Sequence, residues 1–383
     1  MQKIISNLKL SCLVVFPLLV SCASCDKSNE IENDIVNNPI QEEVFFLGAD
    51  LSYVNEMIDC GAIYKDANNN IKNPYTIFEE AGTNLVRLRL WHNPTWTNYS
   101  NFNDVKNAIL ESKRRQMKVL LDFHYSDTWA DPDSQEIPAA WLSDINNTDS
   151  LGNLLYNYTY TVLNDLADEN LLPEIVQIGN EINGMILQQG ALEWPIDWER
   201  NSHLINKGIQ AVRDISTSHN TPVEVMLHIA QPENGLWWFE QATANGITDF
   251  DWIGLSYYPL WSEYSLEQVQ APLENLINTY QKRLMIVETA YPFTLENNDP
   301  ANNILDSNAL INGYPASQEG QLNYLLDLKN IILNAGGEGI IYWEPAWVST
   351  NCSTLWGQGS HWDNATLFDH SGKATLGMQL YNQ

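Results

Sequence analysis

Short apolar runs recur along the chain, and amphipathic segments separate them. The runs are nearly continuous, which is typical of strands buried on both faces of a parallel sheet. The segments between them carry apolar residues at helical spacing, for example over residues 104–116, 203–215, 266–280 and 318–335. The pattern predicts eight strands, at residues 45–52, 85–91, 118–126, 175–182, 224–230, 252–259, 284–292 and 339–347.

Eight strand–helix repeats over about 300 residues predict a closed (β/α)8 barrel. An open, doubly wound sheet is the alternative, but no G-x-G-x-x-G follows the first strand, FFLGADLS. We therefore expect an α/β fold: a single (β/α)8 TIM barrel over residues 44–383, with extended βα loops at its C-terminal face.

The N-terminal segment has the features of an export signal. Lys3 and Lys9 precede a short apolar run at residues 13–20, and Ser21 and Cys22 follow it, so that residues 19–22 read LVSC. Such a run is too short to span a bilayer, and LVSC resembles a bacterial lipobox. We predict a lipoprotein signal peptide over residues 1–21 and lipidation of Cys22, with an ordinary signal peptide as the alternative.

Residues 22–43 are polar, acidic and rich in Asn, so we expect a flexible tether there. Beyond it, Cys60 and Cys352 are the only cysteines. They follow the first and last predicted strands, which become neighbours when a barrel closes. An exported protein can oxidise such a pair, so we predict a disulfide, with two free thiols as the alternative.

The chain is strongly acidic, with a formal net charge of −29 over 383 residues. This charge disfavours nucleic acid, an anionic membrane surface or a strongly anionic polymer as a partner. The sequence also holds 14 Trp and 17 Tyr. Their flat apolar rings suit the faces of sugars, although a Trp-rich core is the alternative. A neutral polysaccharide agrees with both observations.

Polar residues gather where the predicted strands end, and these ends form the rim on which barrel active sites lie. Glu181 follows Asn180 at the end of the fourth strand, and Glu288 ends the seventh. The fourth and seventh strands face each other across a barrel. Glycoside hydrolysis needs two carboxyl groups that flank one bond, so this pair predicts a retaining glycosidase; structural ion pairs are the alternative.

Three histidines at strand ends, His92, His124 and His228, raise the alternative of a two-metal hydrolase. Such enzymes usually begin with H-x-H on the first strand, and this strand has none. We therefore expect no cofactor for catalysis.

Six motifs resemble those of the family 53 endo-β-1,4-galactanases, from about residue 45 to the C-terminus. They are RLRLWHNP (87–94), DFHYSDTWADP (122–132), IGNEIN (178–183), SYYPLW (256–261), VETAYPF (287–293) and YWEPAW (342–347). The resemblance implies that Glu181 is the acid/base and Glu288 the nucleophile. The implied substrate is the β-1,4-galactan side chain of pectin, type I arabinogalactan, cut internally with retention by double displacement.

Two further functions stay open as alternatives: a related retaining β-mannanase or β-glucanase, and a non-catalytic surface glycan-binding lipoprotein. A polymer this large does not cross the cell envelope, so we expect the protein at the outer membrane or cell surface. We expect a monomer.

The resemblance also implies substrate-binding residues. Asn180 would hold the sugar 2-hydroxyl. Arg89, on the same face of the second strand, would hold Glu288 and keep it ionised, with a buried ion pair far from the sugar as the alternative. Tyr257 or Tyr258 would hydrogen-bond Glu288. The other candidates are His92, Asp122 and His124, and, for stacking, Trp91, Trp129, Trp261, Trp343, Trp347 and Trp356, about half of which we expect to be packing residues.

Bacterial members of the family hold a calcium ion between the loops after the seventh and eighth strands. Calcium takes six to eight oxygen ligands. The sequence departs from the family pattern at Asn297 and Ala301. The residues that we expect to hold a structural Ca²⁺ are Asp299, Asn303, Ser360 and Asp363.

Overall fold

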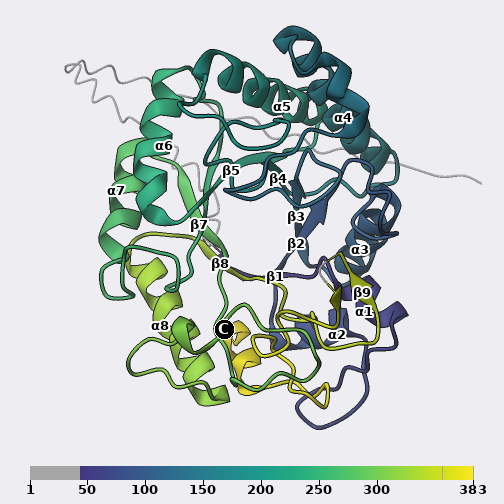
Figure 1. Ribbon diagram of the computed structural model, residues 1–383, viewed down its shortest axis with the longest axis vertical. Helices are drawn as coiled ribbons and strands as arrows, with labels where there is room; N and C mark the ends of the chain where they lie inside the picture. Colours follow the sequence, from purple (N-terminus) through teal and green to yellow (C-terminus); the bar gives the residue numbers. More distant parts are fainter. Residues whose placement is uncertain (1–43, 356, 383) are drawn as a thin grey trace, which may run out of the picture. The chain divides into compact units, whose positions relative to one another are not determined.

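Eight parallel strands form a closed barrel in the computed structural model, which describes residues 44–355 and 357–382 (Figure 1). Each strand pairs with the next along the chain, and the last pairs with the first. The predicted (β/α)8 barrel is confirmed. Its strands are β1 (Phe46–Asp50), β2 (Leu85–Leu90), β3 (Lys118–Phe123), β4 (Ile175–Ile178), β5 (Glu224–Ala230), β6 (Trp252–Ser256), β7 (Arg283–Glu288) and β8 (Gly339–Tyr342).

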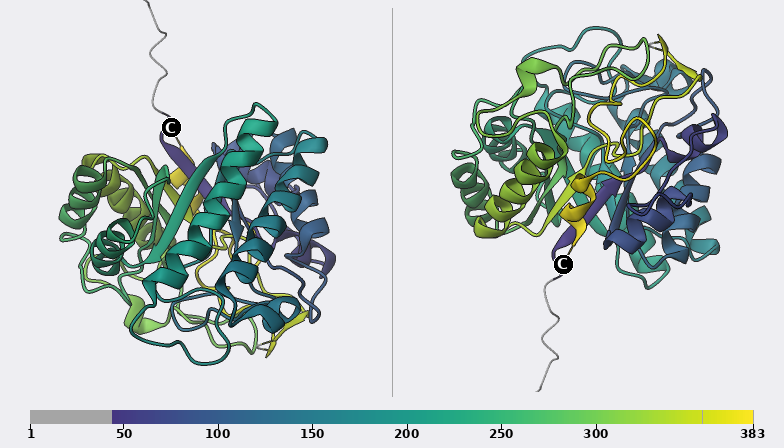
Figure 2. Two further views of the ribbon diagram at one scale, coloured as in Figure 1. Left: turned by 90° about the horizontal axis from the view of Figure 1, so that it is seen from above. Right: turned by 90° about the horizontal axis from the view of Figure 1, so that it is seen from below.

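Helices surround the barrel on its outside, as both views of Figure 2 show. Several begin at a side chain that accepts a hydrogen bond from the first turn, such as Asn101, Asn147 and Ser317. The helices are α1 (Val54–Asp59), α2 (Pro74–Ala81), α3 (Phe102–Arg114), α4 (Thr148–Asp168), α5 (Trp198–Ser218), α6 (Pro232–Ala244), α7 (Gln270–Tyr280) and α8 (Gln318–Asn334). Three short 3-10 helices (Ala139–Asp144, Ser307–Ala309 and Leu376–Tyr381) and a small hairpin (β9, Ser353–Thr354; β10, Gly357–Gln358) complete the described chain.

The inside of the barrel is apolar at one end and polar at the other. A buried cluster that includes Phe46, Leu120, Ile175 and Trp252 fills the end where the strands begin. Near the strand ends the fully buried inward residues are polar, among them Arg87, Asp122, Gln177 and His228. Buried polar groups need partners, so this layer must be built as a network.

The predicted strands extend past their observed ends. The fourth strand, predicted over residues 175–182, ends at Ile178 because Gly179 and Glu181 adopt positive φ angles of 80° and 44°. Tyr125 and Glu344 do the same after β3 and β8. Some of the polar residues that mark the rim, such as Asn180 and Glu181, therefore belong to loops, whereas Glu288 is the last residue of β7.

Cys60 and Cys352 form a disulfide with a Cα–Cα distance of 5.8 Å. Cys60 ends α1, in the connection after β1, and Cys352 lies in the loop after β8. Because β1 pairs with β8, the bond joins two segments that closure of the barrel already brings together. Within residues 44–355 and 357–382, no helix is both long and apolar enough to cross a bilayer.

Candidate active site

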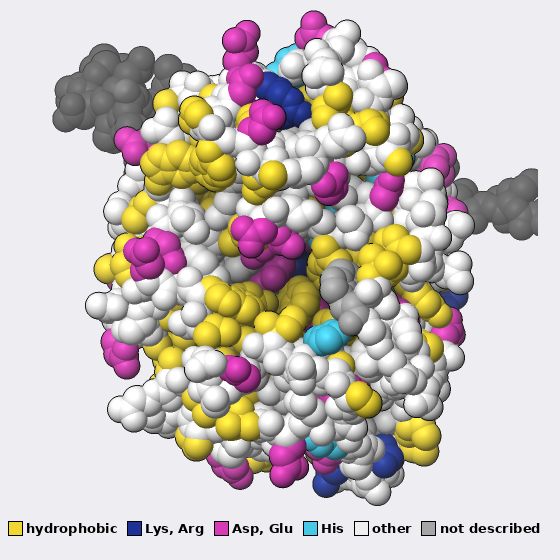
Figure 3. Space-filling view, in the orientation of Figure 1, with side chains coloured by type: hydrophobic (Ala, Val, Ile, Leu, Met, Phe, Trp, Pro, Cys, Tyr) yellow, Lys and Arg dark blue, Asp and Glu magenta, His cyan; other side chains and the backbone are white. Residues whose placement is uncertain are grey.

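A cleft of about 830 Å³ lies at the carboxyl ends of the strands. Figure 3 shows it as a hollow near the centre of the molecule's face, with hydrophobic and acidic side chains in its wall. Residues from the ends of β3 to β8 contribute to the lining, so the cleft crosses the barrel. Among them are Trp129, Asp131, Asn180, Glu181, Asn183, Gln231, Asn234, Tyr258, Trp261, Glu288, Trp343 and Trp347.

Glu181 and Glu288 meet in this cleft, as the sequence predicts. A carboxylate oxygen of Glu181 lies within 4.8 Å of one of Glu288. Retaining glycosidases hold their two carboxyl groups about 5–5.5 Å apart, whereas inverting enzymes need about 6.5–9.5 Å to admit a water. The short separation leaves no room for that water and suits direct attack by one carboxylate.

A tight turn after β4 presents Glu181 to the cleft. Gly179 has a φ of 80°, and a Cβ there would lie 2.5 Å from the Ile182 side chain, so only glycine fits. Glu181 itself has a φ of 44°, a conformation that costs a non-glycine residue energy. The turn aims Glu181 into the cleft while its neighbour Asn180 faces the buried polar layer.

Arg87 is the arginine that holds Glu288. Its Nη1 atom donates to Glu288 Oε1 at 2.8 Å and to Asp50 at 2.9 Å, and its Nη2 atom donates to Asp122 at 2.8 Å and to Asn180 Oδ1 at 2.7 Å. All of these groups are almost fully buried, so little solvent screens the interactions.

The prediction that Arg89 performs this role is wrong. Arg89 pairs with Glu344 at 3.0 Å, and its guanidinium lies 4.1 Å from the ring of Trp129. Arg87 and Arg89 share one strand face, but two residues along a strand separate them by about 6.6 Å. Arg89 therefore meets the end of β8, and it supports the wall of the cleft through Trp129.

The two carboxyl groups have different partners. Burial raises the pKa of Glu181 to about 7, and the Ser256 hydroxyl, which donates to Glu181 Oε1, opposes the rise. Burial also raises the pKa of Glu288, and the nearby Arg87 guanidinium opposes it. Only Glu288 has a cation in contact. When the pair carries a single proton, that proton therefore belongs on Glu181 and the charge on Glu288.

Tyr258 contacts the nucleophile candidate, with its hydroxyl 3.4 Å from Glu288 Oε2. Tyr257 does not: it is buried, and its hydroxyl donates to the carbonyl of Tyr264. Asp122 and His124 are buried beneath the cleft, where they bond to each other. Neither lies in the lining of the cleft. Asp122 holds Arg87, and His124 contacts Asp122, so these roles replace the predicted contact with substrate.

The remaining candidates divide in a similar way. Trp129, Trp261, Trp343 and Trp347 line the cleft, and no acceptor in the described chain meets the buried indole N–H of Trp347. Two other predicted substrate-binding residues, Trp91 and His92, are packing residues. Trp91 is buried against Arg89, and His92 packs on Trp141. Trp356 lies outside the described residues.

Sequence reasoning missed a chain of groups behind Glu181. Ser256 lies between Glu181 and the Nε2 atom of His228, which is 2.9 Å from the hydroxyl. The other ring nitrogen of His228 meets Asn180 Oδ1 at 2.9 Å, and Gln177 bonds to the same amide oxygen. Burial lowers the pKa of His228 well below its usual value, so the ring is neutral. The sequence feature that could have revealed this chain of groups is the set of polar residues on β4, β5 and β6 that point inward: Gln177, His228 and Ser256.

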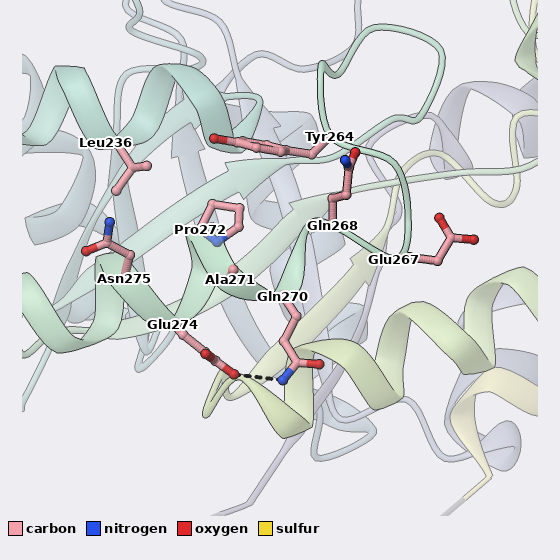
Figure 4. A pocket seen from close by; sticks show the side chains of 9 residues that line it. All are labelled: Leu236, Tyr264, Glu267, Gln268, Gln270, Ala271, Pro272, Glu274 and Asn275. Carbon is pink, nitrogen blue, oxygen red and sulfur yellow. Dashed lines mark hydrogen bonds between the residues drawn. The ribbon is translucent and has the colours of Figure 1, made fainter.

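A second hollow, of about 640 Å³, lies on the outside of the barrel between α6 and α7 (Figure 4). Leu236, Pro272 and the ring of Tyr264 form its apolar wall, and Gln270 donates to Glu274 across its edge. It brings no pair of carboxyl groups together in the way that the cleft does. The candidate chemistry belongs to the cleft.

The pattern of the family described as Glycosyl hydrolase family 53 matches residues 46–381. The chain belongs to this family.

Its relatives agree with this assignment. This family 53 chain is 55% identical over 331 residues to an arabinogalactan endo-β-1,4-galactanase of Cellvibrio japonicus. The alignment covers 86% of this chain and 88% of the relative. Among solved structures, the Ignisphaera aggregans GH53 catalytic domain matches with a TM-score of 0.82 and 30% identity, over 90% of this chain and 97% of that one. A structure of two fungal β-1,4-galactanases matches at 0.76 and 31%, over 89% and 99%. The protein is thus a glycoside hydrolase.

The calcium expected in some family 53 enzymes can be tested against the loops after β7 and β8. Asp299 accepts from Ser360 N, and Asp363 accepts from Asn303 Nδ2 at 2.7 Å, so the two loops meet as expected. Neither aspartate pairs with a cationic side chain in the described chain, although Asp363 is buried. The Oδ1 atom of Asn303 is also buried without a partner there. These oxygens fit a hard cation.

Ser360 is the exception among the four predicted ligands. Its hydroxyl donates to the carbonyl of Trp347 and accepts from Trp362 N, so it is turned away from the aspartates. Only two carboxylates would then hold the ion. Calcium binds more weakly to a site with fewer charged ligands. A site with two carboxylates therefore suits weak binding.

Replacing Ser256 with Ala should move the basic limb of the kcat/KM–pH profile of this family 53 enzyme upward. The Ser256 hydrogen bond favours ionised Glu181, so its loss raises the pKa of Glu181 from about 7. A hydrogen bond to a charged group corresponds to about 1 pH unit or more. Ser262→Ala, which removes a hydroxyl that bonds to Glu233 and Tyr264 N but not to Glu181, should leave the profile in place. A downward or absent shift in Ser256→Ala would contradict the assignment of Glu181 as acid.

Proposed function

We propose that the protein is an endo-β-1,4-galactanase that cuts the galactan side chains of pectin, type I arabinogalactan, with retention of configuration. The observation that carries the proposal is the separation of Glu181 and Glu288, within 4.8 Å on opposite sides of an extended cleft. Relatives that cover most of the chain, at 55% and 31% identity, bear galactanase names.

In the first step, Glu288 attacks the anomeric carbon and Glu181 gives its proton to the bridging oxygen. The bond between these atoms breaks, the leaving chain departs with the proton, and a glycosyl ester forms on Glu288. In the second step Glu181, now ionised, takes a proton from water as the water attacks the anomeric carbon. The bond between that carbon and the Glu288 oxygen breaks, and Glu288 leaves as a carboxylate. Two inversions give net retention.

The surroundings of the two carboxyl groups support this division of roles. A nucleophile must be ionised at rest, and Glu288 is the one that accepts from Arg87. A general acid must hold its proton near neutral pH, and the pKa of Glu181 is raised to about 7. Tyr258 adds a hydroxyl beside Glu288 that can fix its orientation.

Cleavage within the polymer, rather than at its ends, follows from how the cleft extends past the carboxyl groups on both sides. Trp129 and Trp343 lie on the side of β3 and β8, and Gln231 and Trp261 on the side of β5 and β6. Sugars can therefore occupy both sides of the bond that breaks. A β-mannanase or β-glucanase has less support, because the family match and the named relatives point to galactan. A pure binding protein has no need of the close carboxyl pair.

Azide rescue assigns the two glutamates separately. Glu288→Ala should abolish hydrolysis of galactan, and azide should restore turnover as an α-glycosyl azide, because it enters from the face that Glu288 occupied. Glu181→Ala should slow galactan hydrolysis by about 10²–10⁴-fold. With an aryl galactoside, whose leaving group needs no proton, azide should then yield a β-azide.

Glu240→Ala, at an exposed site of α6 outside the cleft lining, serves as the matched control and should retain activity. The same azide anomer from both glutamate variants would contradict the roles proposed here. If the wild-type protein fails to cut galactan but cuts mannan or glucan, the proposal that galactan is the substrate is wrong.

For the loops after β7 and β8, the proposal includes a structural Ca²⁺ held by Asp299, Asn303 and Asp363. Neither aspartate has a cationic partner in the described chain, although both accept hydrogen bonds, and the amide oxygen of Asn303 is buried without a donor; both observations support it. An ion bound only by the folded state stabilises that state by mass action. Its role is to fix the loops, and no step of the reaction uses it.

Chelation should therefore lower the melting temperature, and millimolar Ca²⁺ should restore it. Asp363→Asn should have a lower melting temperature from the start and should lose its response to Ca²⁺. Mg²⁺ should restore less, because it prefers smaller, regular sites. A wild-type melting curve that is the same in excess chelator and in excess Ca²⁺ would contradict the site.

The proposal also places the enzyme on the cell surface as a monomer, anchored through a lipid on Cys22. The sequence LVSC (19–22) supports the anchor, although Cys22 lies outside the described residues. Cys22→Ala should release the enzyme from the membrane fraction and leave its specific activity on galactan unchanged. Cys25→Ala is the matched control and should stay with membranes. A Cys22→Ala variant that still fractionates with membranes would reject the anchor.

A further inference from the structure

Two strongly exposed tryptophans lie together outside the cleft. Trp194 is 59% exposed and Trp237 is 43% exposed, and their ring centroids are 6.3 Å apart with planes inclined by 41°. Trp194 comes from the loop between β4 and α5, and Trp237 from α6. Single exposed apolar residues are common on protein surfaces, whereas grouped ones mark binding surfaces.

The pair rests on a fixed support. Trp198, at the start of α5, packs against Trp237 with ring centroids 6.3 Å apart, and against Trp238 at 5.8 Å. Trp238 is fully buried in the core. The aromatic surface is therefore anchored by two helices and presents its rings with little freedom to lose when a ligand binds.

This surface continues from one end of the cleft. Asn234 lines the cleft, and Trp237 follows it by three residues on α6, which places both on one helix face. Asn183 also lines the cleft, and a Cβ on the next residue, Gly184, would lie 3.9 Å from the Trp194 ring. Figure 3 shows hydrophobic side chains gathered over α6, to one side of the central hollow.

We propose that Trp194 and Trp237 form a sugar-stacking platform that binds the galactan chain beyond the cleft, on its leaving-group side. The proposal rests on the proposed function. Asn183 belongs to the same turn as Glu181, which gives its proton to the leaving oxygen. The part of the polymer that passes Glu181 and Asn183 is therefore the part that departs, and it reaches the two tryptophans next.

The chemistry of the platform matches a neutral sugar chain. In β-galactose the axial 4-hydroxyl leaves one face of the ring as a continuous patch of C–H groups, which can lie flat on an indole. The protein carries a net charge of −29, which disfavours a second copy of the chain or another acidic partner on this surface. The galactan chain bound in the cleft can extend onto these two rings, so we take it as the ligand of this surface.

The test compares long and short substrates in Trp194→Ala, Trp237→Ala and the double variant. On polymeric galactan, kcat/KM should fall about 2- to 10-fold for each ring, through KM, because loss of each ring removes one stacking contact to the bound chain; a tenfold loss corresponds to about 1.4 kcal/mol. On galactotriose, for which the proposal requires no contact with the platform, kcat/KM should match the wild type. Trp237→Phe keeps a ring and should retain most of the polymer activity.

Leu333→Ala is the matched control, since Leu333 is 44% exposed on α8. A binding measurement without turnover completes the test. In a Glu288→Ala background, galactan in a native gel should retard the protein, and adding the two Trp→Ala changes should reduce the retardation.

Equal kcat/KM on polymer for wild type and the double variant would overturn the platform, and so would equal losses on polymer and trimer. Loss of a dimer in the variants, seen by sedimentation, would instead assign the surface to a second copy and also overturn it. In each of these outcomes the wild type still cuts galactan. Failure of the proposed function would appear separately, as a wild type that does not cut galactan.

Discussion

The guanidinium of Arg87 is shared by three buried carboxylates, those of Asp50, Asp122 and Glu288. A buried ion without a partner costs several kcal/mol, so none of these groups is stable there alone. Burial opposes the charge on Arg87, but Asp122, Glu288 and Asp50 outweigh it and raise the pKa of the guanidinium. Through these contacts one side chain of β2 ties together the ends of β1, β3 and β7, and its bond to Asn180 adds the turn after β4.

This arrangement creates the asymmetry that the chemistry needs. Three carboxylates already share the one guanidinium in the site. A fourth carboxyl group nearby has its pKa raised mainly by burial, and the carboxylates of Asp131 and Asp122 add to the rise. Glu181 is that group: its contacts are Ser256 and neutral His228 rather than a cation. The polar layer therefore assigns the proton to Glu181 and the charge to Glu288. The positive φ angle of Glu181 brings the two within 4.8 Å.

Much of this could be predicted from the sequence, because strand patterns and strand-end residues are local signals. The prediction for β5, residues 224–230, matches the structure. The strands β3, β4 and β8 end earlier than predicted, because residues with positive φ angles, such as Tyr125 and Glu344, follow them. The pattern of apolar residues does not reveal backbone φ angles. The choice between Arg87 and Arg89 could not be made either. Both face inward, and the partner of each depends on the stagger of neighbouring strands and on side-chain length. The exposure of Trp91 could not be predicted either. It follows β2 at the rim of the barrel, but its side chain is buried.

Covalent bonding of Glu288 to the sugar is the step on which retention depends. Proton NMR of the first products from galactan tests this directly, because the configuration at the new reducing end can be read before it mutarotates. Two displacements in a site where the carboxyl groups lie within 4.8 Å predict that the β-anomer appears first and the α-anomer accumulates later. An α-anomer at the earliest time points would mean that water attacks directly, and it would contradict the roles assigned to Arg87, Glu181 and Glu288.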